Sequence, residues 1–271
     1  MHCAKKNILD QIIAFKKEEV EQKKRLVSVR ELEKSFHYGR TCISMKQSLQ
    51  SSPTGIIAEF KRKSPSKGWI NFEANPAEIV PAYEKAGVSG SSILTDRNFF
   101  GGSEDDLKKI REMVKIPLLR KDFIIEEYQL FEAKAMGADV ILLIASCLTI
   151  KEAGILSRRA KELGMEVLLE LHHEQELDYI HPCTDIAVIN NRDLQSFQVN
   201  LETSLKLIQQ LPPDIIKISE SGISSVDSIV QLREAGFRGF LMGENFMKTS
   251  DPGTACLKFI QEFTMKTGKS C

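Results

Sequence analysis

The sequence predicts a (β/α)8 TIM barrel with an N-terminal helical extension, and three observations support that prediction. Short apolar segments rich in β-branched residues recur eight times, and charged amphipathic segments separate them. Parallel strands need crossover helices, so this alternation favours parallel pairing. Eight such units in about 215 residues favour a closed barrel. An open, doubly wound sheet remains the alternative, although no G-x-G-x-x-G turn follows an early strand.

The predicted strands and helices alternate along most of the chain. Several helices end at a glycine just past the last residue of their apolar pattern, as is typical of helix C-termini. The predicted strands are Ile56–Phe60, Ser91–Leu94, Pro117–Arg120, Val140–Ile144, Glu166–Leu169, Ile186–Ile189, Ile215–Ser219 and Gly239–Met242. The predicted helices are Pro76–Ala86, Glu104–Val114, Glu126–Met136, Ile150–Leu163, Leu201–Gln210, Ser225–Ala235 and Pro252–Phe263.

All 271 residues are predicted to form a single domain. Apolar residues at roughly helical spacing among Lys and Glu predict an amphipathic helix over residues 6–25, and a short helix is expected at Val29–Ser35. These helices make residues 1–48 an N-terminal extension to a barrel that covers residues 49–263. Residues 264–271 are expected to be a tail without regular structure.

The composition favours a cytoplasmic protein that binds neither nucleic acid nor membranes. The 37 Lys and Arg residues balance 37 Asp and Glu residues, so the charge excess of a nucleic-acid or membrane-surface protein is missing. No apolar run approaches the ~18 residues that a spanning helix needs, and the N-terminus lacks the apolar block of a secretory signal. A monomer or a weak homo-oligomer is expected, and the sequence does not decide between them.

The cysteine and histidine residues predict neither a disulfide framework nor a metal site. Six cysteines are scattered without a C-x-x-C pair in a chain that is not short, so all six are expected to be ordinary thiols. His172, His173 and His181 have no second ligand at metal-binding spacing. We therefore predict that the protein binds no metal.

Charged and hydrogen-bonding residues crowd the ends of six predicted strands, whose interiors are apolar. Because the active site of a (β/α)8 barrel lies at the C-terminal ends of its strands, these residues are expected to converge. One strand-end Lys or Glu could be an ordinary surface residue, but the whole set favours a site. The segments are Glu59-Phe60-Lys61, Lys121-Asp122-Phe123, Glu170-Leu171-His172, Asn190-Asn191-Arg192, Glu220-Ser221-Gly222 and Gly243-Glu244.

Two acid–base pairs are predicted among these residues. Glu59 and Lys61 are two positions apart and share one face of their strand, so they form either a structural ion pair or a tuned acid–base couple. Lys121 and Glu170 would add a second pair across the barrel mouth.

A phosphate site is predicted after the last two strands, where such barrels commonly bind phosphate. Ser221-Gly222 and Gly243-Glu244 offer backbone N–H groups that an anion can approach without a Cβ in the way, although a tight turn would also use glycine. The loop Phe99-Phe100-Gly101-Gly102-Ser103 suits an aromatic substrate, or else packs under itself.

Five segments of the chain, in order, resemble motifs of the indole-3-glycerol phosphate synthase family of tryptophan biosynthesis. The resemblance runs from about residue 6 to residue 263, and each segment lies at a predicted strand end. The segments are Glu59-Phe60-Lys61-Arg62-Lys63-Ser64-Pro65-Ser66, Leu94-Thr95-Asp96 with Phe99-Phe100-Gly101-Gly102, Leu119-Arg120-Lys121-Asp122-Phe123, Ile189-Asn190-Asn191-Arg192-Asp193-Leu194 and Ser219-Glu220-Ser221-Gly222-Ile223.

The resemblance implies a carbon–carbon carboxy-lyase that acts on a phosphorylated small molecule. The family closes the ring of 1-(2-carboxyphenylamino)-1-deoxy-D-ribulose 5-phosphate with loss of CO2 and water. The ring carbon attacks the ribulose carbonyl, and the resulting iminium-like intermediate is its own electron sink, so no cofactor is expected. The protein must supply a proton donor, a base and anchors for the carboxylate and the phosphate.

By the same resemblance, Lys121 corresponds to the general acid and Glu170 to the general base. Glu59 and Lys61 correspond to a pair that supports proton transfer and holds substrate anions. Which lysine donates which proton is left open. Asn190 is the fifth residue of the implied catalytic set and, with Arg192 and Ser64, orients the anthranilate end. The other implied roles are substrate binding by Phe123 with Phe99 or Phe100 at the ring, and by Ser221, Gly222, Gly243 and Glu244 at the phosphate, with Glu220 tuning the lysines.

The chain departs from the family pattern at His173, at Val188 and in the more polar strand Gly90–Leu94. None of these departures replaces a matched catalytic residue, but Val188 could alter the packing beneath Asn190. Two other functions stay open. A phosphoribosylanthranilate isomerase would need a Cys at the end of the first strand, which this chain lacks, and a silent barrel that only binds substrate would need no matched acid and base.

Overall fold

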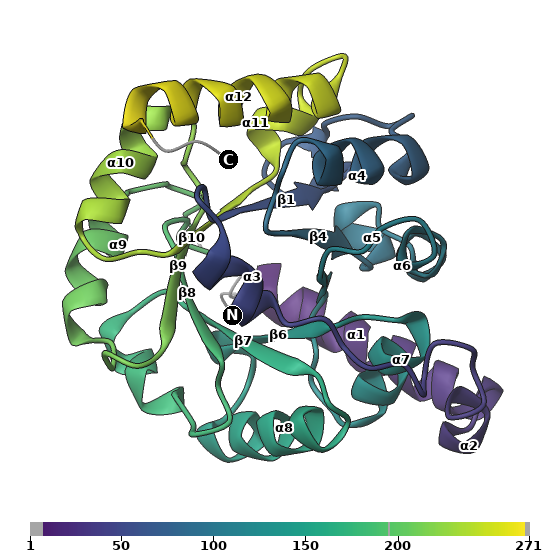
Figure 1. The fold of residues 1–271 in the computed structure, drawn as a ribbon. Helices are drawn as coiled ribbons and strands as arrows, with labels where there is room; N and C mark the ends of the chain where they lie inside the picture. The colour runs from purple at the N-terminus through teal and green to yellow at the C-terminus, as the bar shows by residue number, and fades with distance from the viewer. Residues whose placement is uncertain (1–7, 195, 269–271) are drawn as a thin grey trace, which may run out of the picture.

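The computed structural model describes residues 8–194 and 196–268, and it confirms the closed barrel. Eight parallel strands pair in chain order, and the last pairs back to the first (Figure 1). Every predicted strand is present, with ends shifted by one or two residues at most. The barrel strands are β1 (Ile56–Phe60), β4 (Gly90–Leu94), β5 (Leu118–Lys121), β6 (Val140–Ile144), β7 (Glu166–Leu171), β8 (Ile186–Asn190), β9 (Ile216–Glu220) and β10 (Gly239–Met242).

Helices surround the barrel and bury the outward-facing apolar side chains of the strands (Figure 1). The predicted helix over residues 201–210 is a short α-helix followed by a 3-10 turn, Ile208–Gln210. The surrounding helices are α4 (Pro76–Lys85), α6 (Glu104–Arg111), α7 (Tyr128–Met136), α8 (Ile150–Glu162), α9 (Glu202–Leu207), α10 (Val226–Glu234) and α12 (Pro252–Thr267).

The last helix runs four residues past the predicted end of the barrel. The expectation of an irregular tail from residue 264 is therefore wrong for residues 264–267, which continue α12 up to the left-handed Gly268. The hydroxyl of Thr267 donates to the carbonyl of Phe263 within this last turn. Residues 269–271, which include Cys271, lie outside the described part of the chain, as do residues 1–7 with Cys3.

The inside of the barrel holds a second apolar cluster, and its alternation sets the direction of the strand-end residues. Ile57, Leu119, Leu168, Val188 and Ile218 all belong to this cluster. Side chains two positions apart share one face of a strand, so each strand also directs its next-but-one residue toward the barrel axis. Those residues are Glu59, Lys121, Glu170, Asn190 and Glu220. Val188 is fully buried in this cluster and fills the layer beneath Asn190.

The N-terminal extension covers both ends of the barrel. The predicted helix over residues 6–25 is confirmed as α1 (Ile8–Leu26) in its described part, and α2 (Val29–Leu32) follows it. The unpredicted α3 (Met45–Ser51) closes the N-terminal end of the barrel, where Met45 and Leu49 enter the interior cluster. Gly90 and Gly239 make room for them, since a Cβ on Gly90 would lie 2.4 Å from the Met45 methyl carbon.

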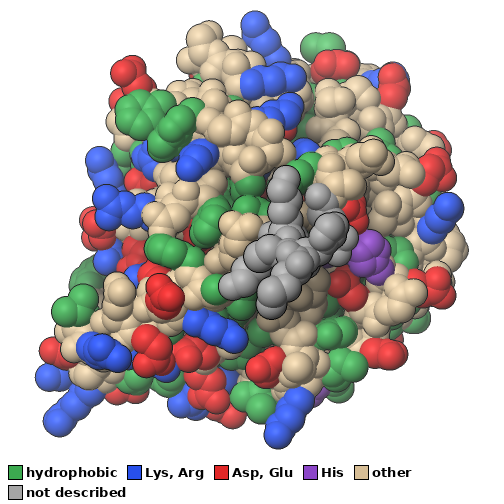
Figure 2. Space-filling model, turned by 180° about the vertical axis from the view of Figure 1, so that it is seen from behind, with side chains coloured by type: hydrophobic (Ala, Val, Ile, Leu, Met, Phe, Trp, Pro, Cys, Tyr) green, Lys and Arg blue, Asp and Glu red, His purple; other side chains and the backbone are tan. Residues whose placement is uncertain are grey.

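Short elements that the sequence did not predict lie at the opposite end of the barrel, where the strands have their C-termini. They are the hairpin of β2 (Lys63–Ser64) and β3 (Gly68–Trp69), and the helices α5 (Arg97–Phe100) and α11 (Glu244–Met247). Figure 2 shows this face, with hydrophobic side chains near its middle and charged side chains mostly toward its edge. Among the described helices, none is both long enough and apolar enough to cross a membrane.

Candidate active site

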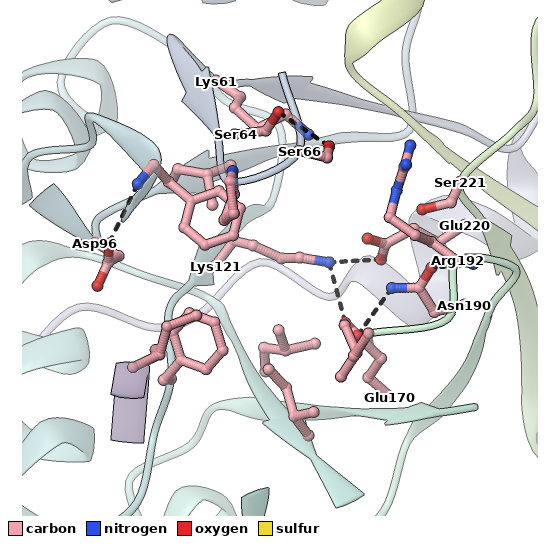
Figure 3. A pocket seen from close by; sticks show the side chains of 18 of the residues that line it. Lys61, Ser64, Ser66, Asp96, Lys121, Glu170, Asn190, Arg192, Glu220 and Ser221 are labelled. Atoms are coloured by element: carbon pink, nitrogen blue, oxygen red, sulfur yellow. Dashed lines mark hydrogen bonds and ion pairs between the residues drawn. The ribbon is translucent and has the colours of Figure 1, made fainter. Parts of the chain in front are cut away.

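Lys121, the last residue of β5, lies at the centre of a group of buried charges (Figure 3). Its Nζ donates to Glu220 Oε2 at 2.5 Å and to Glu170 Oε2 at 3.2 Å. The Nδ2 of Asn190 donates to the other oxygen of Glu170 at 2.9 Å. Four residues predicted from the sequence are thus joined in one hydrogen-bonded group, each from a different strand.

The pKa values in this group favour a protonated Lys121 and an ionised Glu170. Burial alone would lower the pKa of Lys121, but Glu170, Glu220 and Glu59 outweigh it and hold that pKa well above its usual range. Burial alone would raise the pKa of Glu170, but Lys121 and His172 hold it well below its usual range. Burial, with repulsion from Glu170 and Glu59, raises the pKa of Glu220 to about 7. At neutral pH the group therefore presents an ammonium beside a carboxylate.

The predicted pair at the end of β1 forms beside this group. Lys61 Nζ donates to Glu59 Oε1 at 2.5 Å, and the Glu59 side chain is 3% exposed. Gly243 packs directly against Glu59, because a Cβ on residue 243 would lie 2.7 Å from Glu59 Oε1. The glycine after β10 is thus needed for the position of the acid as well as for access to the backbone.

An apolar wall faces the charged group across the same pocket. Ile8, Leu9 and Ile12 of α1 contribute to it, with Leu142 and Ile144 of β6. Two phenyl rings complete this wall, and α1 covers the pocket from above. These rings are those of Phe100 and Phe123, whose centroids are 6.0 Å apart.

Most of the predicted site residues line this pocket. Phe99 does not, because its ring packs edge-on against Phe15 of α1 with centroids 6.0 Å apart. Gly222 and Gly243 line the adjoining cavity. The predicted residues in the pocket are Glu59, Lys61, Ser64, Lys121, Phe123, Glu170, Asn190, Arg192, Glu220, Ser221 and Glu244.

The adjoining cavity has the features of an anion site. Ser221 and Gly222 both adopt left-handed backbone conformations, with φ of 69° and 76°. For a serine this conformation is strained, and such strain is concentrated at functional sites. Gly243 caps the N-terminus of α11, so the positive end of that helix faces the same cavity.

Lys67 is a residue of this cavity that the sequence did not predict. It lies in the hairpin after β1, and its Nζ donates to Glu244 Oε1 at 2.5 Å. Arg192 lies 3.8 Å from the other oxygen of the same carboxylate. The side chain of Glu244 therefore contacts two cations at the rim of the cavity.

A buried lysine of the N-terminal extension was also missed. Lys16 of α1 is 1% exposed, and its Nζ lies 3.0 Å from Asp96 Oδ2 and 2.9 Å from Asp122 Oδ1. Asp96 also accepts hydrogen bonds from the first turn of α5, and Asp122 directly follows Lys121. Lys16 thus joins α1 to two loops of the pocket. Its sequence context gives no signal, because it lies in a run of exposed Lys and Glu.

The family of the chain follows from its similarity to known proteins. A family model described as indole-3-glycerol phosphate synthase matches residues 9–259. The chain belongs to the indole-3-glycerol phosphate synthase family. An indole-3-glycerol phosphate synthase of Bacteroides thetaiotaomicron is 51% identical over 256 residues, which cover 94% of this chain and 98% of the relative. One from a Polaromonas species is 42% identical, covering 92% and 96%.

A solved structure supports the fold independently of the family. The 3-hexulose-6-phosphate synthase of Salmonella typhimurium aligns with a TM-score of 0.60 at 13% identity, over 78% of this chain and 99% of that chain. At that identity the likeness shows the shared fold alone. Membership of the indole-3-glycerol phosphate synthase family confirms the resemblance found in the sequence and disfavours the isomerase alternative.

Proposed function

We propose that the charge cluster around Lys121 carries out the proton transfers of indole-3-glycerol phosphate synthesis. As a member of its family, the chain is a carboxy-lyase of tryptophan biosynthesis, and it converts 1-(2-carboxyphenylamino)-1-deoxy-D-ribulose 5-phosphate into indole-3-glycerol phosphate. The observation that supports these roles is the contact of the Lys121 ammonium with Glu170 and Glu220, opposite an apolar wall and beside an anion cavity.

The first step is attack of the anthranilate ring on the ribulose carbonyl. Phe100, Phe123 and the α1 side chains hold the ring, while Ser64, Asn190 and Arg192 orient its carboxylate end. Lys121 gives a proton to the carbonyl oxygen as the carbon–carbon bond forms, so the oxygen becomes a hydroxyl. The raised pKa of Lys121 ensures that the proton is present when the substrate arrives.

Decarboxylation follows without help from a cofactor. The new bond leaves a cationic iminium system in the ring, and the electron pair of the breaking bond to CO2 flows into it. Loss of the hydroxyl as water then needs a second proton, which we assign to Lys61, while Glu170 removes the proton from the former C1 of the ribulose.

The protons balance over the cycle. Glu170 Oε2 lies 3.2 Å from Lys121 Nζ, so the proton taken by Glu170 returns directly to Lys121. Lys61 regains its proton from solvent, since its side chain is 18% exposed beside the mouth. One proton is consumed overall, as expected when a carboxylate leaves as neutral CO2.

The phosphate end of the substrate binds in the adjoining cavity. The backbone N–H groups of residues 221, 222, 243 and 244 donate to the phosphate oxygens, and Lys67 adds a positive charge at the rim.

We also propose a cytoplasmic enzyme, a monomer or weak homo-oligomer that binds no nucleic acid and needs no metal or cofactor. The zero net charge supports the absence of a nucleic-acid partner.

The decisive assay mixes purified protein with the carboxyphenylamino sugar phosphate and a chelator, and it follows indole fluorescence together with CO2 release. Equal amounts of both products support the proposal, and tight binding without either product contradicts it.

Replacing Glu170 with glutamine should lower kcat by about 100-fold with a smaller effect on KM. The amide oxygen can accept from only one of Asn190 and Lys121, which each donate to a different oxygen of Glu170, and the amide cannot take the proton of the last step. Stopped-flow fluorescence should still show substrate binding. Unchanged kcat would show that another group is the base.

Replacing Gly243 with alanine should lower kcat about 10-fold by displacing Glu59. The added Cβ would lie 2.7 Å from Glu59 Oε1, so the carboxylate must move away from Lys61. Gly39→Ala is the matched control, since nothing lies within 4 Å of a Cβ there. Steady-state kinetics and melting temperatures of both variants test this, and equal kinetics would refute the displacement.

A further inference from the structure

His172 is a buried histidine that contacts the proposed base and that the mechanism so far does not use. It directly follows β7, on the same face as Glu170, and it is 4% exposed. The sequence placed it in a strand-end segment and predicted no metal partner for it, but assigned it no role. The structure places it between two carboxylates.

Each of the two carboxylates lies near a different nitrogen of the imidazole ring. His172 Nε2 is 3.3 Å from Glu170 Oε1, and Nδ1 is 3.7 Å from Glu176 Oε2. Glu176 is fixed in turn, because the same oxygen accepts hydrogen bonds from the backbone N–H groups of His172 at 2.5 Å and His173 at 3.2 Å. The loop that carries His172 therefore holds the Glu176 carboxylate beside Nδ1.

The charges around His172 favour the imidazolium form. Burial alone would lower the pKa of His172, but Glu170 and Glu176 outweigh it and raise the pKa to about 10. The other titratable group facing these carboxylates is Cys147, whose pKa is raised by burial and by the same two carboxylates, so it stays a neutral thiol. Lys121 acts on the ring only from beyond Glu170.

Glu170 thus has three partners that favour its ionised form. Lys121 occupies Oε2, whereas Asn190 and His172 share Oε1. In the proposed mechanism Lys121 becomes neutral when it protonates the substrate. At that moment Glu170 loses its main counter-charge, with Glu59 and Glu220 close by, and its pKa would rise before its own step begins.

We propose that His172 is a positioning residue that acts as an imidazolium, fixing Glu170 Oε1 and keeping Glu170 ionised while Lys121 is without its proton. The proposal rests on the proposed function, since it needs Glu170 as the base. Glu176 serves as the counter-ion that keeps His172 charged and its ring oriented, the arrangement by which an oriented third group supports a catalytic pair.

The test uses His172→Gln, which keeps an N–H donor and removes the charge. We expect kcat to fall about 10-fold, with KM changed less than about twofold. The pH below which kcat declines should move upward by about one unit, because Glu170 becomes easier to protonate without the neighbouring cation. A variant that only loosened the fold would lower the melting temperature without moving this pH.

Two further variants separate charge from packing. His173→Gln is the matched control, since His173 is the exposed neighbour and should keep the wild-type profile. Glu176→Gln keeps the imidazole but lowers its pKa, so kcat should begin to decline at a lower alkaline pH than in wild type.

Nuclear magnetic resonance of the histidine rings gives a readout independent of turnover. The ring signal that is absent from the spectrum of His172→Gln is assigned to His172. In wild type this signal should report a protonated ring at pH 8, where a free histidine is neutral. A neutral His172 at pH 7, or a His172→Gln profile identical to wild type, overturns the proposal. Absence of turnover in the wild type would instead overturn the proposed function, whatever the ring signal shows.

Discussion

Replacing Lys121 with methionine should reduce kcat by about 10³-fold while KM changes by less than about threefold. The reason is geometric: the Lys121 ammonium is the one proton donor that contacts both Glu170 and Glu220 within the described site. In the proposed mode, substrate binding depends mainly on the apolar wall and the anion cavity, which the substitution leaves in place. Initial rates from indole fluorescence, with substrate binding measured separately, test the split.

Replacing Lys121 with arginine separates the effect of its positive charge from the effect of its transferable proton. Lys121→Arg restores a cation to the two carboxylates but does not release a proton at any working pH, since the arginine pKa exceeds 12. We expect the melting temperature of Lys121→Arg to be closer to that of wild type than the melting temperature of Lys121→Met, while kcat stays low. If arginine restores turnover, Lys121 acts only through its charge, and the acid must be sought at Lys61.

The barrel was predictable because its signal is local. Each strand is a run of four to six residues whose apolar and β-branched character is visible within the strand itself, as at Ile56–Phe60, which is buried throughout. Their position at strand ends was enough to identify Glu59 and Lys121 as candidates without any knowledge of their neighbours. α3 was missed because only Met45 and Leu49 of its seven residues are buried, which is too weak a pattern.

The missed parts of the site depend on contacts between distant segments. Lys16 looks like any other lysine of an amphipathic helix until α1 docks on the loops after β4 and β5. His172 was judged by metal-binding spacing, yet its partners are carboxylates, one of them beyond a turn. Phe99 and Phe100 are equivalent in sequence, and only the path of α5 sends one to Phe15 and the other into the pocket.

Replacing Lys16 with methionine should destabilise the protein by about 3 kcal/mol and also lower kcat/KM. Methionine fills a similar volume but leaves Asp96 and Asp122 buried, at 0% and 3% exposure, without this cation. Burial already raises the pKa of Asp96. Burial alone would raise the pKa of Asp122 too, but Lys16 and Arg120 hold it well below its usual range. Denaturant unfolding and steady-state kinetics measure the two effects.

The sign of the pH dependence follows from these carboxylates. In wild type, the lowered pKa of Asp122 contributes stability that is present above about pH 4 and is lost as the pH falls through its folded value. In Lys16→Met the pKa values of both aspartates rise, because their cation is gone. The deficit relative to wild type should therefore be full at neutral pH and should shrink in acid, as the aspartates take up protons and lose their charge.

Two comparisons decide whether the charge of Lys16 or its bulk holds α1 in place. Lys17→Met changes the exposed neighbour and should leave both stability and kinetics unchanged. Adding Asp96→Asn to Lys16→Met removes one of the unpaired charges, so it should recover part of the lost stability, whereas a packing defect would only grow worse. Asp96 also caps α5, which carries Phe100 into the pocket. The double variant should therefore recover a larger share of the lost stability than of the lost kcat/KM. If stability and kcat/KM recover to the same extent, α1 stabilises the fold and has no separate role in positioning the substrate ring.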